Sequence, residues 1–96
     1  MNKAEVLHPG QVLEDMYLKP LKISRYRLAK ETFLDITRIS EIVRGKRGIT
    51  ADTALRLARF FGNRPEFWMD LQTQYEMYLG AKEILPVLRE IRRYSA

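Results

Sequence analysis

The sequence contains no cysteine and a single histidine, His8, in 96 residues. The lack of cysteine excludes disulfides and thiolate metal sites and suits a reducing compartment. One histidine cannot complete a zinc site, and no His-Glu-x-x-His, Gly-rich phosphate loop or Ser/His/Asp set is present. We therefore expect no metal, no cofactor and no enzymatic activity.

Long apolar runs are also missing. No segment approaches the roughly 20 apolar residues that span a bilayer, and the first ten residues, MNKAEVLHPG, lack the apolar stretch of a secretory signal. We expect a cytoplasmic protein without membrane contact. Because 46% of the residues are hydrophobic, residues 1–96 can form one small domain with its own core.

Strand patterns are absent as well: alternation of polar and apolar residues never persists, and no hairpin dipeptide occurs. Helical spacing dominates and predicts an all-α domain of five or six helices. Residues that start helices precede several apolar-periodic stretches, namely Pro9, Ser24, Asp35 and Thr50, with a capping box of Asn63 and Glu66 around Pro65. Residues that end or interrupt helices follow them, namely Pro20, Gly45, Gly62, Gly80 and Pro86.

The second and third predicted helices are separated only by Phe33 and Leu34. Two short helices joined by so tight a turn, the second one polar and basic, are typical of a helix-turn-helix, here at about residues 24–44. In that arrangement the first helix crosses the DNA backbone and the second enters the major groove.

The charge distribution agrees with this placement. Residues 19–64 carry twelve Lys/Arg against four Asp/Glu, whereas residues 1–18 and 65–81 are net acidic. Such a concentration is an electrostatic footprint for a polyanion. A solvated charged face explains it equally well, so the charge supports the motif and does not establish it.

The start of the third helix holds the candidate base-reading residues. Thr37 and Arg38 lie in its first turn, where side chains reach base edges. Arg38 could contact guanine O6 and N7, or it could bind a phosphate. Glu41 could accept from a cytosine amine, or it could pair with Arg38 or Arg44.

The stretch SRYRLAKETFLDITRISEIVRGKRGITADTALRLARFFGNRPEFWMDLQ, preceded by HPGQVLEDMYLKPL, resembles the HigA-type (VapI-like) antitoxins. These form a branch of the Cro/C1-type helix-turn-helix family. The resemblance covers about residues 7–75 and rests on HPG, RISEI, RGKRGITADTALRLARFFG and PEFW. It implies a bacterial homodimer that binds a pseudo-palindromic operator in double-stranded DNA and represses its own operon. It also implies neutralisation of HigB, a RelE-like toxin that cleaves mRNA on the ribosome.

The resemblance places a phosphate contact at Arg25, and Arg44, Lys46 and Arg47 would act similarly beyond the third helix. Six to eight neutralised phosphates per dimer would give a slope of log K on log salt of about −5 to −7.

Two positions depart from the family. Phe33 stands where glycine is usual in the turn, and a positive φ there would cost a bulky residue on the order of 1 kcal/mol. The ring could offset this with contacts, or the turn could be re-formed. Ile36 replaces a proline or small residue, and its side chain could touch a thymine methyl or lie against the turn.

The aromatic residues allow two interpretations. Core packing is the simpler one for Phe61, Phe67 and Leu71. A domain this small seldom needs so much aromatic surface, so the C-terminal region 65–96 is a candidate dimer or partner region. Its candidate contacts, with one residue from the preceding helix, are Phe60, Trp68, Tyr75, Tyr78, Val87 and Ile91. A dimer would place two reading helices about 34 Å apart.

Acidic residues before and after the basic segment are candidates for docking a basic toxin, namely Glu5, Glu14, Asp15, Glu66, Asp70 and Glu76. Three other functions remain open: a stand-alone transcriptional regulator without a toxin, the RNA-cleaving toxin itself, and a protein-interaction module with a vestigial motif. The toxin alternative predicts a sheet packed on helices.

Overall fold

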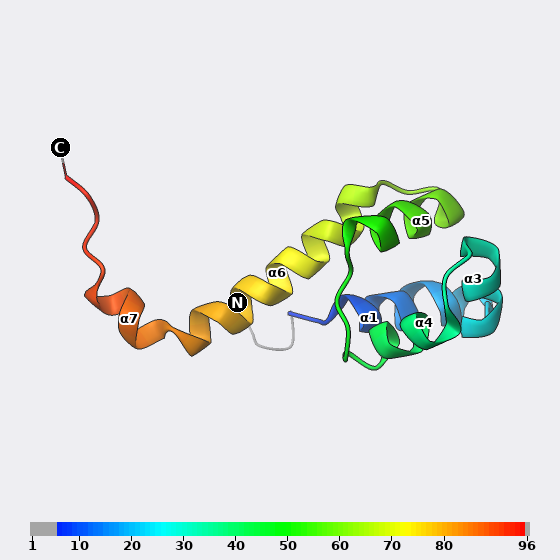
Figure 1. The fold of residues 1–96 in the computed structure, drawn as a ribbon, viewed down its shortest axis with the longest axis horizontal. Coiled ribbons are helices and arrows are strands. Elements are labelled where there is room, and N and C mark those ends of the chain that lie inside the picture. Colours follow the sequence, from blue (N-terminus) through cyan, green and yellow to red (C-terminus); the bar gives the residue numbers. More distant parts are fainter. Residues whose placement is uncertain (1–5, 96) are drawn as a thin grey trace.

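The computed structural model describes residues 6–95, and within that range every regular element is a helix. The elements are α1 (Pro9–Val12), η2 (Leu13–Leu18), α2 (Lys19–Leu21), α3 (Arg25–Thr32), α4 (Ile36–Val43), α5 (Ala51–Phe61), α6 (Pro65–Glu83) and α7 (Leu85–Glu90) (Figure 1). The predicted all-α class is confirmed.

Three predicted N-caps are confirmed, because each side chain accepts a hydrogen bond from a backbone N–H in the first turn. Ser24 Oγ lies 3.0 Å from the nitrogen of Arg27, and Asp35 Oδ1 lies 2.8 Å from that of Thr37. Thr50 Oγ1 accepts from the Thr53 amide at 3.4 Å. These contacts satisfy donors that have no partner within the helix, so α3, α4 and α5 begin where the sequence indicates.

The first helix does not stop at Pro20, contrary to the prediction. Helical backbone continues without a break from α1 through η2 to the end of α2 at Leu21. The middle part is a π-helical turn, in which the amide of Lys19 donates to the carbonyl of Glu14, five residues earlier. A proline ring normally meets the carbonyl four residues before it, and the wider turn gives that ring room. The helix ends instead at Lys22, which has a left-handed φ of 56°.

The capping box predicted at Asn63 and Glu66 is wrong. The N-cap of α6 is Arg64, whose side chain makes no capping hydrogen bond. The Asn63 amide binds tertiary partners instead: it accepts from the Trp68 indole at 3.1 Å and donates to the Tyr17 hydroxyl at 3.2 Å. A side chain already occupied by these two contacts is not available to the helix start.

The predicted break at Gly80 is also wrong, because α6 continues through it to Glu83. A glycine inside a helix costs about 1 kcal/mol relative to alanine, which a helix of 19 residues tolerates. Pro86 lies in the first turn of α7, where its missing N–H costs no hydrogen bond.

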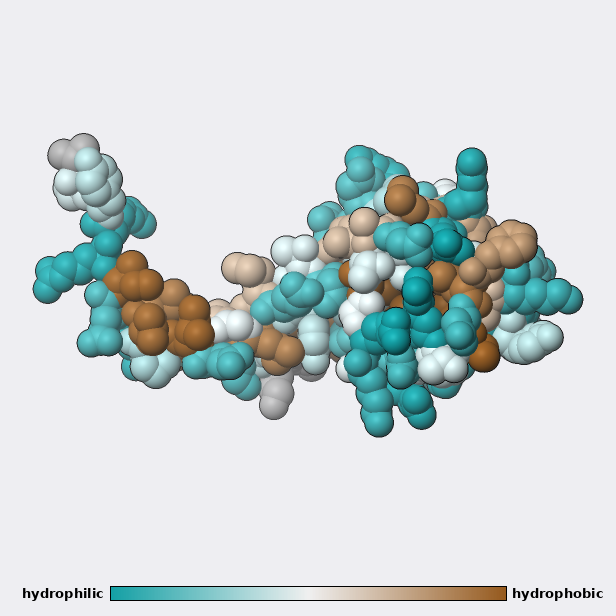
Figure 2. All heavy atoms as spheres, viewed as in Figure 1, coloured by the Kyte–Doolittle hydropathy of each residue, from teal (hydrophilic) through white to brown (hydrophobic). Residues whose placement is uncertain are grey.

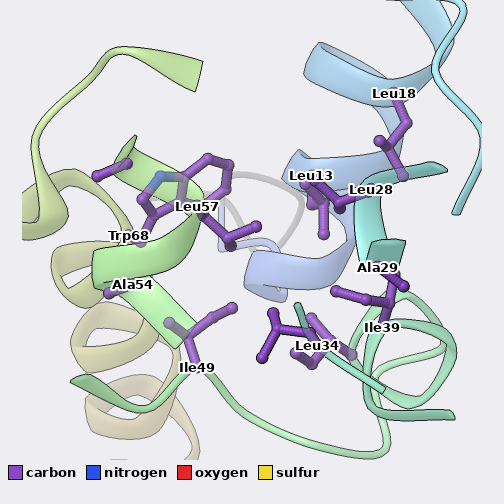
Figure 3. Close-up of a cluster of buried hydrophobic side chains, with 12 residues drawn as sticks. Leu13, Leu18, Leu28, Ala29, Leu34, Ile39, Ile49, Ala54, Leu57 and Trp68 are labelled. Atoms are coloured by element: carbon purple, nitrogen blue, oxygen red, sulfur yellow. The ribbon is translucent and has the colours of Figure 1, made fainter. Parts of the chain in front are cut away.

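One hydrophobic core joins the N-terminal helical run to α3, α4, α5 and the beginning of α6 (Figure 3). Its fully buried side chains include Leu13, Leu28, Ile39, Ile42, Leu57 and Trp68. Trp68 was predicted as a dimer or partner residue, and this is wrong: its ring is 0% exposed and packs against Tyr17 and Phe67. Leu55, on the outer side of α5, is 59% exposed.

The molecule is elongated, with principal extents of 52 × 27 × 22 Å. We call residues 6–76 the head and residues 77–95 the arm. The arm comprises the last turns of α6, then α7 and the tail, and it projects away from the head (Figure 1). Among the described residues, no helix combines the length and the apolar character needed to cross a membrane.

Candidate nucleic-acid interface

The turn between α3 and α4 has the predicted tight geometry. Phe33 adopts a left-handed conformation with φ 58° and ψ 35°, and the next amide, that of Leu34, donates back to the Ala29 carbonyl at 2.9 Å. The backbone thus keeps the conformation that favours glycine, although the residue is phenylalanine. The ring is 87% exposed, so it gains little packing in return for the strain.

Helix α4 is fixed by its apolar face and by its C-terminal end. Ile39 and Ile42 are completely buried. The N-terminal run approaches the end of α4 so closely that a Cβ atom on Gly10 would lie 1.7 Å from the carbonyl oxygen of Ile42. Only glycine fits this contact between two backbones. The left-handed Gly45, with φ 75°, then ends α4 as predicted.

The opposite face of α4 presents the predicted base-reading residues at its first turn. Ile36 is 40% exposed, so part of its side chain is accessible at the start of the helix. Thr37 is exposed as well, and Arg38 is partly exposed beside it. The structure therefore brings Ile36, Thr37 and Arg38 together on one accessible surface at the N-terminal end of the helix.

Glu41 does not pair with Arg38 or Arg44, as one of its predicted alternatives required. Its Oε1 lies 2.8 Å from Nη2 and 2.9 Å from Nε of Arg47, in the loop after α4. Arg38 instead pairs with Asp52 in the first turn of α5, with its Nη1 3.2 Å from Oδ2 of Asp52. Local helical spacing suggested the wrong partners because the chain folds back after Gly45 and brings residues from outside α4 closer.

The predicted phosphate-binding residues lie at both ends of the motif. Arg25, at the start of α3, is partly buried, and its Nε lies 3.8 Å from Oε1 of Glu14. Arg44, Lys46 and Arg47 are exposed at the end of α4 and in the loop that follows. Four basic groups thus flank the reading surface on two sides, which is the arrangement that positions a helix in a groove.

Gln72 is an important residue that the sequence did not indicate. It is only 7% exposed, and its Oε1 accepts the Ile49 amide at 2.7 Å while its Nε2 donates to Glu76 at 2.9 Å. A Cβ on Gly48 would lie 2.7 Å from the Gln72 amide nitrogen. Gln72 therefore fixes to α6 the loop that contains Lys46 and Arg47. Its partner Ile49 lies 23 residues away in the sequence, so no local pattern could reveal the contact.

His8 lies beside the same loop, because a Cβ on Gly45 would lie 3.8 Å from Cγ of its ring. Its Nδ1 accepts the Gly10 amide at 2.9 Å, and its ring packs edge-on against Tyr75 at 4.9 Å between centroids. Partial burial lowers the pKa of His8 below its ordinary value, so the neutral ring that can accept this bond is favoured. Its role is to cap the start of α1.

The remaining partner candidates divide between head and arm. Phe60 is half-buried and lines a hollow with Phe33 and Leu55. Tyr75 and Tyr78 are also half-buried, whereas Val87 and Ile91 are 55% and 64% exposed. Figure 2 shows a hydrophobic surface gathered over the arm. Its exposed apolar residues are Met77, Leu79, Ile84, Leu85, Val87, Leu88 and Ile91.

The acidic candidates are mostly occupied within the chain. Glu14 pairs with Arg25, Asp15 with Lys19 at 3.3 Å, and Glu66 with Arg64 at 3.5 Å. Glu76 accepts from Gln72. Asp70 is exposed on α6 and makes no ion pair among the described residues. Glu5 lies outside the described residues.

Residues 6–95 contain no group of three or more His, Asp or Glu side chains arranged to hold a metal ion. What this part of the chain does contain is a first helix with one buried face, a tight turn, and an anchored second helix whose N-terminal turn is accessible and carries Arg38. That geometry defines a helix-turn-helix protein.

Comparison with known proteins gives the same class. The helix-turn-helix family model matches residues 16–68. Virulence-associated protein I of Dichelobacter nodosus is 45% identical over 82 residues, which are 85% of this chain and 76% of that protein. The chain spans between 61% and 76% of the length of the first three curated relatives that it matches.

Two solved structures are similar over nearly their whole length. One is Pseudomonas aeruginosa antitoxin HigA with the higBA promoter, 34% identical, with a TM-score of 0.89 over 94% of this chain and 99% of that one. The other is an addiction module antidote protein of the HigA family from Coxiella burnetii, 40% identical, with a TM-score of 0.86 over 93% of this chain and 98% of that one. The chain therefore belongs to the Cro/C1-type helix-turn-helix family, in its HigA-type branch.

Proposed function

We propose that this chain is a dimeric antitoxin that binds operator DNA through α4, represses its own operon and neutralises a HigB/RelE-like ribonuclease. The observation that carries the DNA-binding part is the first turn of α4. It exposes Ile36, Thr37 and Arg38 on a helix whose other face is fully buried. The HigA structure with its promoter is a similar chain bound to DNA, which supports this use of the fold.

Specific binding requires two kinds of contact. Thr37 and Arg38 would contact base edges, while Arg25, Arg44, Lys46 and Arg47 would contact phosphates. Glu41 acts mainly by orienting Arg47, with which it is paired. The base-reading group is therefore smaller than the four residues that the sequence suggested.

Dimerisation would occur through the arm. A face with this many exposed aliphatic side chains is unfavourable in water, and a second copy of the same arm would cover it. Pairing two arms would hold two heads at a fixed separation, as reading of a pseudo-palindromic site requires.

Toxin docking would use an acidic surface of the chain. Among the acidic candidates that the structure describes, Asp70 has no ion pair in the head and would be the easiest to use. Reversing its charge with Asp70→Lys should weaken a complex with a basic toxin, and unchanged binding would remove this residue from the interface.

The runner-up is a stand-alone regulator that uses the same DNA surface without a toxin. Purification of the tagged chain from its native cells separates the two. A stoichiometric small basic protein that stays bound after nuclease treatment supports the antitoxin proposal, whereas a homodimer carrying only DNA supports the regulator.

The DNA-binding part has its own test. The test uses a DNA duplex that the wild-type chain selects from a random library. Thr37→Ala combined with Arg38→Ala should reduce affinity for this duplex at least tenfold. The circular dichroism spectrum of the double variant should remain that of a helical protein. Arg59→Ala, at an exposed position of α5 outside both proposed interfaces, is the control and should leave affinity within twofold. Unchanged affinity in the double variant would remove α4 from the proposed interface.

A further inference from the structure

A network of side chains joins the recognition helix α4 to both neighbouring elements. Arg56, on α5, donates from Nη1 to the carbonyls of Thr32 and Phe33 at 2.9 Å each. Its Nε lies 3.1 Å from Oδ2 of Asp52, one turn earlier on α5. The same Oδ2 accepts from Nη1 of Arg38 at 3.2 Å. The end of α3, the first turn of α5 and the reading face of α4 are thus connected through one carboxylate.

This network contributes little to stability. The side chains of Arg38, Asp52 and Arg56 are 35%, 55% and 38% exposed, and ion pairs in such surroundings are largely screened by water. Its main physical effect is to restrict the orientation of the Arg38 side chain. A free arginine samples many rotamers, and a contact with a carboxylate that is itself fixed by Arg56 restricts that sampling.

The geometry of the contact also determines which donors remain. Arg38 donates to Asp52 through Nη1, which leaves Nε and Nη2 without a protein partner among the described residues. These two N–H groups are parallel and match O6 and N7 of a guanine. The adjacent carboxylate offsets the charge that would otherwise attract Arg38 to any phosphate.

We propose that Asp52, held by Arg56, is a positioning residue that directs Arg38 to a guanine and so determines sequence specificity. This inference rests on the proposed function, since it assumes that α4 reads DNA. It resolves the choice for Arg38 between a guanine and a phosphate in favour of the guanine. Asp52 itself touches no base.

The test is in vitro selection from a random duplex library with the full-length chain. The wild type should enrich a motif that contains a guanine in each half-site. Asp52→Asn keeps the shape and removes the charge, so its selected motif should lose preference at that guanine and keep the other positions. The ratio of affinities for the selected duplex and for random DNA should fall about tenfold, mainly because binding to random DNA tightens.

Glu83→Gln is the matched control, because it changes the net charge by the same amount at an exposed position at the end of α6 and leaves the motif unchanged under the proposal. Asp52→Glu should restore most of the preference for guanine. In the Arg38→Ala background, Asp52→Asn should change the ratio by less than twofold, because a residue that acts through Arg38 has no effect without it.

The outcomes are distinguishable. No motif with the wild type would overturn both the proposed function and this inference. A wild-type motif that Asp52→Asn retains in full, or a loss that persists undiminished in the Arg38→Ala background, would overturn the inference alone. Circular dichroism of every variant verifies that the helices are intact, and Asp52→Ser, which also removes the carboxylate, carries the test if Asp52→Asn does not fold.

Discussion

At the scale of single residues, Phe33 has a backbone conformation that its side chain does not favour. A left-handed φ costs a non-glycine residue about 1–2 kcal/mol, and a ring that is 87% exposed recovers little of this. Arg56 binds the carbonyl of Phe33 and helps to hold the turn in place. The turn is therefore maintained by its surroundings and not by the residue within it.

We predict that Phe33→Gly stabilises the protein by about 0.5–1 kcal/mol in chemical denaturation. The relief of strain exceeds the additional flexibility that glycine gives the unfolded chain. Phe33→Ala is the control: it removes the ring and keeps the Cβ, so the free energy of unfolding should change by less than about 0.5 kcal/mol. Equal stabilisation by alanine would mean that the exposed ring, and not the backbone, is unfavourable.

At the scale of elements, Gln72 connects α6 to the loop after the recognition helix. We predict that Gln72→Met, which has a similar volume, destabilises the protein by about 1–3 kcal/mol, because the buried Ile49 amide loses its acceptor. Denaturant unfolding measures the loss, and hydrogen exchange at the Ile49 amide should accelerate. Gln74→Met, at an exposed position on the same helix, should change stability by less than about 0.5 kcal/mol. Slow exchange at Ile49 in the Gln72 variant would contradict this role.

The start of α1 should depend on pH through His8. Its pKa is lowered in the folded state, so between the ordinary value of 6.5 and the folded value the unfolded chain binds more protons. The stability that neutral His8 contributes is thus complete above pH 6.5 and is lost as the pH falls through the folded pKa. His8→Asn keeps a capping acceptor without titrating, so the difference in unfolding free energy between wild type and variant should change with pH only below about 6.5. A constant difference from pH 7.5 to 5 would contradict it.

Elements that depend on local chemistry could be predicted from the sequence, and those that depend on distant partners could not. Ser24, Asp35 and Thr50 cap their helices because each needs only an amide two or three residues ahead. Asn63 looked equally suitable, but Tyr17 and Trp68 occupy its amide. The same distinction applies to the candidate interface. Helical spacing was enough to predict that Thr37 is exposed. The contacts of Asp52 with Arg38 and of Gln72 with Ile49 depend on the tertiary fold.

At the scale of the whole molecule, the arm of a single copy exposes apolar side chains to water, which is unfavourable. We predict that Val87→Glu converts a dimer into a monomer, raising its dissociation constant by on the order of a hundredfold, because burying an unpaired carboxylate in an apolar interface is costly. Sedimentation equilibrium measures the change. Gln74→Glu adds the same charge at an exposed position of α6 and should leave the dimer intact. A variant at Val87 that remains dimeric would place the interface elsewhere.

Gln72 is the last buried residue of the described chain, so the hydrophobic core is complete before the arm begins. Residues 77–95 contribute no side chain to the buried core, and the arm is a helical continuation of α6. Substitutions in the two parts are therefore free to accumulate separately over evolution. Under the proposed function, a recombination that replaced the coding sequence after α6 leaves the head would change which copies pair and preserve the sequence that each head reads.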